Sequence, residues 1–186
     1  MITTPDGVID VHGRSGALGG PPDQARLRSL REQASSVLVG AGTARTENYG
    51  PASKYGLQIA VVTTSCALDF TSPLFTSGCG IVATTVNAPQ VPVHSIRAGT
   101  NAVDLAAIID LLPHGMVQVE GGPRLNAALF DADLVDAMNL TVSPRIGGVR
   151  GASISEAPHA PRQFALTSVT TDSDFVFVRY ERLRSA

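Results

Sequence analysis

The stretch VQVEGGPRLNAALF, residues 117 to 130, decides the fold of this chain. It begins as a strand-like run and continues from Pro123 as an amphipathic, helix-like one. Pro123 suits the first position of a helix, because the N–H group that proline lacks would be unpaired there in any case. Gly121 and Gly122 allow the backbone to turn sharply between the two elements. The junction therefore predicts a strand that leads directly into a helix.

The same change of period recurs along the chain. Strands are expected at residues 1–4 (with 8–11 as a possible continuation), 35–40, 58–64, 80–84, 92–96 and 116–120. Helices are expected from an N-cap at Asp23 to about residue 35, and at 103–112 and 123–132. Late strands are expected in MNLTVSP, FALTSV and FVFVRYERL, and the turn-forming TTDSD predicts that the last two form an antiparallel hairpin. This order predicts an α/β fold, a mixed sheet with helices on both faces.

Composition excludes several classes of protein. A chain of 186 residues with 44% hydrophobic residues is expected to form one domain with a real core. A net charge of −2 and a pI near 6.0 give no reason to expect nucleic-acid or membrane-surface binding. No apolar run approaches the ~20 residues of a membrane span. Cys66 and Cys79 are expected to be reduced thiols in a cytosolic protein, and the spacing of the histidines favours no metal site.

The glycine junction is also a candidate phosphate site. A helix N-terminus presents unpaired N–H groups and a partial positive charge, and Arg124 would add charge at the rim. A plain strand-to-helix turn is the alternative reading of this junction. A second glycine-rich strand end, LVGAGTARTEN at 38–48, precedes Thr43 and Glu47 and favours a long ligand lying across the strand ends. Neither junction matches the Rossmann or P-loop pattern.

Five segments, which follow one another along the chain in the family's order, resemble the reductase domain of riboflavin biosynthesis, the RibD C-terminal family. This family has the fold of dihydrofolate reductase. The segments are TPDG (4–7), GRSGALGG (13–20), LREQASSVLVGAGTARTENYGP (30–51), VEGGPRLNAAL (119–129) and LVDAMNLTVSPRIGG (134–148). The resemblance implies a single reductase domain over residues 1–186, with a mixed, mostly parallel sheet, helices on both faces and a C-terminal antiparallel hairpin. Only Met1 to Thr3 stand where the family has a full first strand, so this strand is expected to be short.

The resemblance implies that NADPH reduces the ribosyl group of 5-amino-6-(5-phosphoribosylamino)uracil to ribityl. The residues at cofactor-binding positions of the family are Thr43, Ser65, Gly121, Gly122, Pro123, Arg124 and Leu125. Those at substrate-binding positions are Ser15, Arg31 and Glu120. Arg31 is a candidate fork for the sugar phosphate, with a solvated helix arginine as the alternative. Glu47 is the catalytic candidate, because a carboxylate there can orient the ribose hydroxyls or relay a proton.

Two other functions remain open at this point. The fold suits a dihydrofolate reductase-like oxidoreductase that acts on another small substrate, because fold does not fix function. The second alternative is that the chain is a non-catalytic, nucleotide-binding relative of the family, since Thr4 replaces the serine of the family's first motif. The resemblance also implies a homodimer, and the cysteines, read as reduced thiols, favour a cytoplasmic location. No pair of basic residues in the sequence clearly marks a preference for NADPH over NADH.

Overall fold

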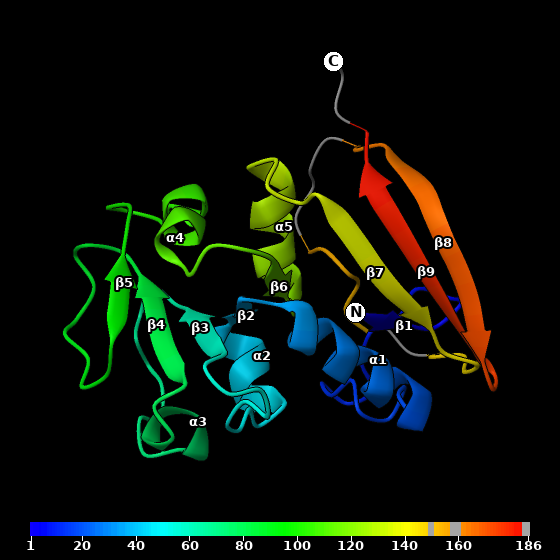
Figure 1. Cartoon of the computed structure of the whole chain (residues 1–186), viewed down its shortest axis with the longest axis horizontal. Helices are drawn as coiled ribbons and strands as arrows, with labels where there is room; N and C mark the ends of the chain where they lie inside the picture. The colour runs from blue at the N-terminus through cyan, green and yellow to red at the C-terminus, as the bar shows by residue number, and fades with distance from the viewer. Residues whose placement is uncertain (149–150, 157–160, 184–186) are drawn as a thin grey trace.

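Strands and helices alternate along most of the chain in the computed structural model, which describes residues 1–148, 151–156 and 161–183 (Figure 1). The strands are β1 (Ile2–Thr3), β2 (Ser36–Gly40), β3 (Gln58–Val62), β4 (Gly80–Thr84), β5 (Ser95–Arg97), β6 (Val117–Val119), β7 (Ala137–Val142), β8 (Phe164–Asp172) and β9 (Phe175–Arg182). The helices are α1 (Pro21–Gln33), α2 (Ala41–Thr46), α3 (Pro73–Thr76), α4 (Leu105–Leu111) and α5 (Pro123–Asp131).

Hydrogen bonding divides the strands into two sheets, which lie at opposite sides of the molecule (Figure 1). The larger sheet is parallel throughout, in the order β5-β4-β3-β2-β6. The smaller has the order β1-β7-β9-β8, in which β1 runs parallel to β7 and the other pairs are antiparallel. The expected α/β class with mostly parallel strands and an antiparallel C-terminal hairpin is confirmed, but hydrogen bonding separates the strands into two sheets instead of the single mixed sheet that was expected.

The larger sheet is buried on both faces. Successive side chains of a strand point to opposite sides, so each central strand contributes to two hydrophobic cores. One core joins β2, β3 and β4 to α2 and α3, and its members include Val37, Val39, Ile59, Val61, Val82, Ala44, Leu74 and Phe75. The other core joins the same strands to α4 and α5, and its members include Leu38, Ala60, Ile81, Leu105, Ile108, Leu125 and Leu129. Helices therefore cover both faces, as expected, and the carboxyl ends of the strands are held in fixed positions.

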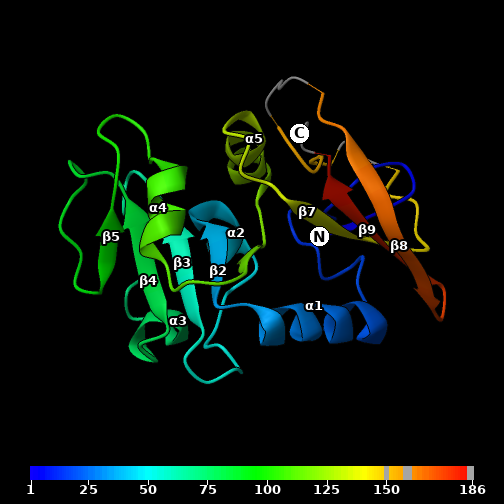
Figure 2. The same ribbon diagram turned by 45° about the horizontal axis from the view of Figure 1, so that its top comes forward.

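Helix α1 passes below the region where the two sheets meet (Figure 2). The prediction that Asp23 caps this helix is wrong: the N-cap is Gly20, and two prolines occupy the first helical positions. Proline is accepted there because the first N–H groups have no partner inside the helix, so Asp23 falls in the first turn instead. Leu30, near the other end of α1, is buried.

Two local features differ from expectation. Residues 8–11 do not continue β1; Val11 instead pairs with Arg14 in an isolated bridge. Helix α3 has only four residues and was not predicted, since so short an apolar stretch has no detectable period.

Both cysteines carry free thiols. Within the described residues, no helix has the length and apolar character needed to span a membrane.

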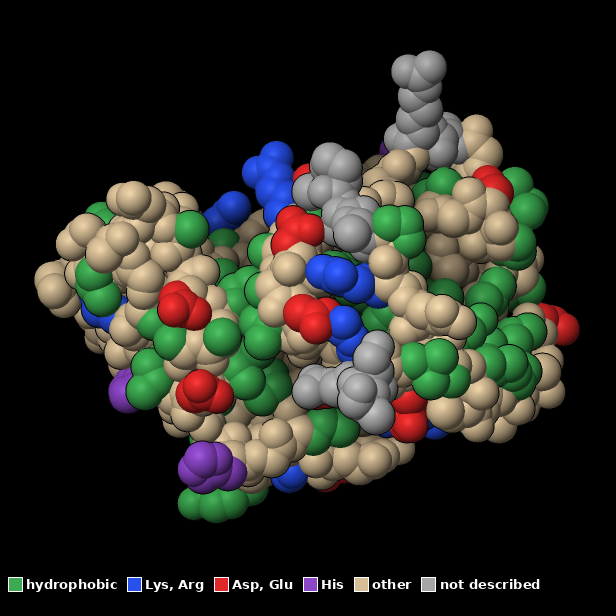
Figure 3. Space-filling model, turned by 90° about the horizontal axis from the view of Figure 1, so that it is seen from above, with side chains coloured by type: hydrophobic (Ala, Val, Ile, Leu, Met, Phe, Trp, Pro, Cys, Tyr) green, Lys and Arg blue, Asp and Glu red, His purple; other side chains and the backbone are tan. Residues whose placement is uncertain are grey.

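The smaller sheet has one face directed toward the rest of the molecule and one that is partly uncovered. Phe177 on the inner face is buried and packs with Ile2 and Leu18. Residues paired across a sheet share a face. The pairing places these apolar residues together on the other face: Met138, Leu140, Leu166, Val169, Val178 and Tyr180. Leu166 and Val169 are 55% and 53% exposed, and Figure 3 shows hydrophobic side chains gathered at the end of the molecule that this sheet forms.

Candidate active site

A cleft of about 780 Å³ lies between the two sheets. Its walls are the carboxyl ends of β2, β3 and β6, the first turn of α5, one side of α1, and residues of β7 and β9. Small-molecule sites are typically concave spaces of about 300–1,000 Å³ at such junctions. The cleft therefore has the size and the position expected for an active site in an α/β fold.

The glycine junction forms part of the cleft wall between β6 and α5. Its chain is held by β2: Glu120 N–H donates to Leu38 O at 2.9 Å, and Gly40 N–H donates to Gly121 O at 2.6 Å. Gly121 has φ +84°, in the region that favours glycine, and the peptide bond between Gly121 and Gly122 is cis. A Cβ atom at Gly122 would overlap Thr43 Oγ1 of α2. Strand β6 therefore leads through glycines directly into α5, as the sequence predicted, and this junction packs closely against the start of α2.

The first turn of α5 opens on this cleft. Its N-cap is Gly122, no described side chain caps it, and Pro123 stands at the first helical position. Leu125 is buried, whereas the Arg124 side chain is 93% exposed and pairs with Glu156 at 3.1 Å. The first N–H groups of an α-helix lack partners within the helix and carry partial positive charge. The residues present here thus suit an anion with several phosphate oxygens.

Glu120, directly before the glycines, is the centre of a compact charged cluster. Its carboxylate accepts from Arg31 Nε at 2.7 Å, from Arg31 Nη2 at 2.5 Å and from the Tyr49 hydroxyl at 2.5 Å. The side chains of Glu120 and Arg31 are only 5% and 22% exposed. The hydrogen bonds to Glu120 raise the pKa of Arg31, and burial, with the nearby Glu120 charge, raises the pKa of Tyr49. Both groups consequently remain protonated around the carboxylate.

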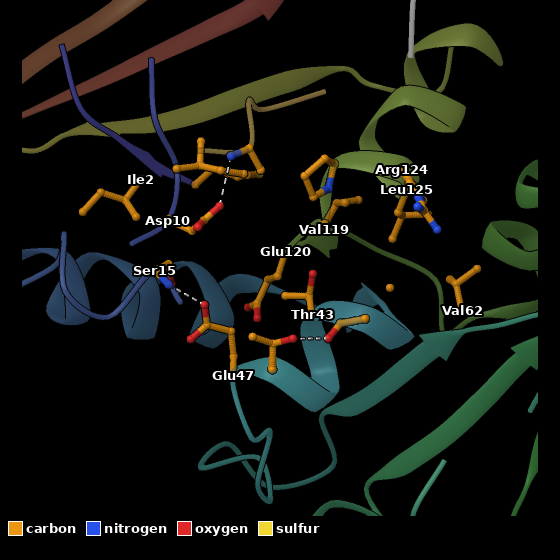
Figure 4. A pocket seen from close by; sticks show the side chains of 18 of the residues that line it. Ile2, Asp10, Ser15, Thr43, Glu47, Val62, Val119, Glu120, Arg124 and Leu125 are labelled. Atoms are coloured by element: carbon orange, nitrogen blue, oxygen red, sulfur yellow. Dashed lines mark hydrogen bonds between the residues drawn. The ribbon is translucent and has the colours of Figure 1, made fainter. Parts of the chain in front are cut away.

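Glu47 ends helix α2 and projects into the cleft (Figure 4). One oxygen of its carboxylate accepts the Ser15 N–H at 2.6 Å, which ties the loop before α1 to the end of α2. Asp10, also in the cleft wall, accepts from Gly13 N–H at 2.9 Å and from Ala152 N–H at 3.2 Å. Glu47 and Asp10 thus bring two carboxylates to one end of the cleft.

Ser65 lies at the edge of this arrangement. It is exposed on the loop after β3, and its hydroxyl accepts from Ala67 N–H at 3.4 Å. Arg45 of α2 lines the cleft and donates to the carbonyl of the same Ala67 at 3.0 Å. The neighbouring residues Thr63 and Thr64 line the cleft, but Ser65 does not.

Most of the predicted site residues gather around this one cleft. Those that line it are Ser15, Thr43, Glu47, Glu120, Gly122, Pro123, Arg124 and Leu125. Gly121, Arg31 and Ser65 do not line it. Lining residues that the sequence analysis missed include Asp10, Asp23, Arg26, Leu27, Tyr49, Thr63, Thr64 and Asn139. The signal for those on α1 is their spacing on one side of the helix; no sequence pattern marks Asp10 or Tyr49. Within the described residues, no group of three or more histidine, cysteine or acidic side chains is arranged to hold a metal ion.

Solved structures establish the class of fold. The chain superposes with a TM-score of 0.85 on a pyrimidine reductase-like protein from Corynebacterium diphtheriae, at 24% identity over 99% of this chain and 90% of that one. It superposes with a TM-score of 0.62 on dihydrofolate reductase from Enterococcus faecalis, at 15% identity over 97% of this chain and 92% of that one. The fold is therefore that of dihydrofolate reductase, as the resemblance implied.

Sequence comparison identifies the family within this fold. The RibD C-terminal domain matches residues 1–177. A relative from Methanothermobacter thermautotrophicus, 2,5-diamino-6-ribosylamino-4(3H)-pyrimidinone 5′-phosphate reductase, is 28% identical, with 93% of this chain and 92% of the relative covered. The chain belongs to the RibD C-terminal domain family.

Proposed function

We propose that this protein is an NADPH-dependent reductase that converts 5-amino-6-(5-phosphoribosylamino)uracil to its ribitylamino form in riboflavin biosynthesis. The observation that carries the proposal is that the uncapped first turn of α5 and the carboxylate of Glu47 border the same cleft. An anion-binding helix start and an acidic side chain within one cavity are what a phosphate-bearing hydride donor and a reducible sugar require. Membership of the RibD C-terminal domain family supports the same reaction.

The residues at the glycine junction fit a dinucleotide. Gly122, Pro123, Arg124 and Leu125 would hold its phosphates, and Thr43 would contact it from α2. When bound, NADPH supplies the hydride. The dihydrofolate reductase of similar fold from Enterococcus faecalis was solved in complex with NADP(H), which supports a nicotinamide cofactor.

A preference for NADPH over NADH is supported by Arg45. Its guanidinium donates to the carbonyl of Ala67, whose N–H donates to the Ser65 hydroxyl. Thr63 and Thr64, just before Ser65, line the cleft, so a 2′-phosphate bound here would have a cation and hydroxyl groups as partners. The preference is tested by titrating wild type and Arg45→Gln with each cofactor, following nicotinamide fluorescence. A smaller difference between the two affinities in the variant is expected, and an unchanged difference contradicts the role of Arg45.

The chain's own acid–base groups account for the proton transfer that accompanies hydride addition. Converting a ribosylamino group to ribitylamino breaks the bond between C1′ and the ring oxygen, adds a hydride to C1′ and leaves a proton on the freed oxygen. Glu47, held in place by the Ser15 N–H, is the group we assign to orient the sugar hydroxyls and to manage that proton. The Arg31–Glu120–Tyr49 cluster would fix the floor of the cleft beside the cofactor phosphates.

A second candidate substrate differs only in the base. The relative from Methanothermobacter thermautotrophicus is named for the 2,5-diaminopyrimidinone, which carries an amino group where the uracil has an oxygen. Purified protein should oxidise NADPH with one of these two phosphoribosyl compounds far faster than with dihydrofolate. Turnover of dihydrofolate alone would favour a different small substrate, and cofactor binding with no turnover would favour a non-catalytic relative.

The protein is further proposed to act as a cytoplasmic homodimer. The partly uncovered apolar face of the smaller sheet, with Leu166 and Val169 exposed, supports an isologous interface between two copies. Free thiols at Cys66 and Cys79 suit a reducing compartment, which cell fractionation would test. Sedimentation analysis should give a dimer, and Leu166→Glu should shift it toward monomer; a monomeric wild type contradicts the interface.

A further inference from the structure

One side of α1 faces the cleft. The residues of this helix that line it are Asp23, Arg26, Leu27 and Leu30, which follow the i, i+3, i+4, i+7 spacing of a single helix face. Asp23 turns back over the start of the helix, where its Oδ2 would lie 3.1 Å from a Cβ atom built on Gly19. Arg26 is therefore the cationic group that α1 contributes to the cleft.

The arginines of the cleft differ in what their guanidinium groups bind. Arg45 donates to Ala67 O, and Arg124 pairs with Glu156. Arg26 is half-buried and, within the described part of the chain, has neither an ion pair nor a hydrogen bond. A guanidinium withdrawn from water is most stable with an anionic partner that accepts from its fork of donors.

Arg31, which the family resemblance makes a candidate fork for the sugar phosphate, already forms an ion pair in this structure. Its Nε and Nη2 both donate to Glu120, and it does not line the cleft. Arg26 and Arg31 are separated by about 7.5 Å of helix axis, at 1.5 Å per residue. The Arg31 end of α1 adjoins the glycine junction through Glu120, whereas the start of α1 adjoins β9, where a Cβ atom on Gly20 would lie 3.1 Å from Phe175. Arg26 is thus set back from the glycine junction along α1, toward the end of the helix that adjoins β9.

We infer that Arg26 binds the 5′-phosphate of the ribosylamino-pyrimidine substrate. This inference rests on the proposed function for the identity of the substrate, but the anion site itself stands on a guanidinium in the cleft that has no partner among the described residues. A phosphate dianion at this position would engage the fork of Arg26, and the sugar would extend from there toward Glu47. Binding of the phosphate would thus position the sugar, so loss of Arg26 should weaken the phosphorylated substrate selectively.

The test compares Arg26→Gln with the matched variant Arg28→Gln, whose arginine is exposed on the same helix and lies outside the cleft lining. Each protein is assayed with the pyrimidine substrate and with its dephosphorylated form. For the phosphorylated substrate, Arg26→Gln should lower kcat/KM by ~10- to 100-fold, the range for losing a charge-assisted hydrogen bond. The dephosphorylated substrate should be affected by less than ~3-fold, and Arg28→Gln should affect neither. Equal losses for both substrates, or none, would overturn the inference.

A binding measurement separates this inference from the proposed reaction. Ribose 5-phosphate and plain ribose are titrated calorimetrically against wild type, Arg26→Gln and Arg26→Lys, with thermal melting as a check that each variant is folded. Ribose 5-phosphate should bind wild type more tightly than ribose does, Arg26→Gln should abolish the difference, and Arg26→Lys should keep part of it. If neither pyrimidine is reduced but this pattern holds, the proposed reaction fails and the phosphate site stands. If a pyrimidine is reduced but discrimination by phosphate is unchanged in Arg26→Gln, the site fails and the reaction stands.

Discussion

Arg31 holds Glu120 by both oxygens of its carboxylate: Nε lies 2.7 Å from Oε1, and Nη2 lies 2.5 Å from Oε2. Arg31 belongs to α1, and Glu120 is the residue directly before the glycine pair. The Tyr49 hydroxyl, 2.5 Å from Oε2, completes the cluster, and the Arg31 guanidinium carbon lies 5.4 Å from the centre of the Tyr49 ring. The ion pair therefore ties α1 to the place where α5 begins.

Breaking this pair should destabilise the fold. Arg31→Met would leave the Glu120 charge, on a side chain only 5% exposed, with a single hydrogen-bond donor. We expect the free energy of unfolding to fall by about 2–4 kcal/mol, below the full cost of a deeply buried pair because the Arg31 side chain is partly exposed. Urea denaturation measures the change. Tyr49→Phe, which removes one hydrogen bond to the carboxylate, should cost only about 1–2 kcal/mol; a larger effect of Tyr49→Phe than of Arg31→Met would contradict this ranking.

A side chain at position 122 should weaken the binding of NADPH. Gly122→Ala places a Cβ atom against Thr43 Oγ1, so α2 or the start of α5 must shift. We expect the Kd for NADPH to rise by at least ~10-fold, because N–H groups at a helix start bind a phosphate only from fixed positions. Fluorescence titration gives the value. Gly50→Ala is the control, since no described heavy atom lies within 4 Å of its Cβ position. Unchanged NADPH binding by Gly122→Ala would contradict the phosphate site.

Neutralising Glu47 should affect the chemistry more than the binding. In Glu47→Gln the side chain keeps an oxygen that can accept the Ser15 N–H, so the loop before α1 should hold its place. Without the carboxylate, kcat should fall by ~100-fold or more, the usual range for loss of a general acid–base group, while the Kd for NADPH stays the same. Steady-state assays with the pyrimidine substrate measure kcat. A wild-type kcat in this variant would remove Glu47 from the mechanism.

Asp6 gives the fold a measurable dependence on pH. The Thr4 hydroxyl and the N–H groups of Gly147 and Gly148 lower the pKa of Asp6 from 3.8 to about 2, so the ionised form favours the folded state. Its stabilising effect is present above the unfolded pKa of 3.8 and disappears as pH falls through about 2. Wild type should therefore be more stable than Asp6→Asn at neutral pH, and the difference should vanish in acid. Asp110→Asn, at an exposed residue of α4, is the control for denaturation at each pH; a difference that persists in acid contradicts the assignment.

The sequence predicted the elements whose signals are local. The apolar runs of β2, β3 and β4 and the proline-led start of α5 lie close to their expected residues, because strand burial and the N–H-free proline act over a few positions. The cap of α1 was mispredicted because a good capping residue, Asp23, follows two prolines that are themselves accepted at a helix start. Local signals compete there, and the prolines determine the boundary.

The candidate site was predictable only in part, for a different reason. The glycine junction follows β6 directly and Glu47 comes one short helix after β2, and the carboxyl ends of these strands meet at one edge of a parallel sheet. Which arginine of α1 faces the cleft depends on how the helix is rotated against two sheets; the spacing shows which residues share a face of the helix, but not which face is turned to the cleft. Arg31 was named as a candidate phosphate ligand because it matches a substrate-binding position of the family, and the structure adds Arg26 as the arginine of α1 that lines the cleft.

The structure of the protein crystallised with NADPH tests the central claim most directly. The account predicts the cofactor's pyrophosphate against the main-chain amides at the start of α5, between Gly122 and Leu125, with the nicotinamide directed toward Glu47. A cofactor bound elsewhere, or a first turn of α5 covered by the protein's own side chains in the complex, would contradict the account.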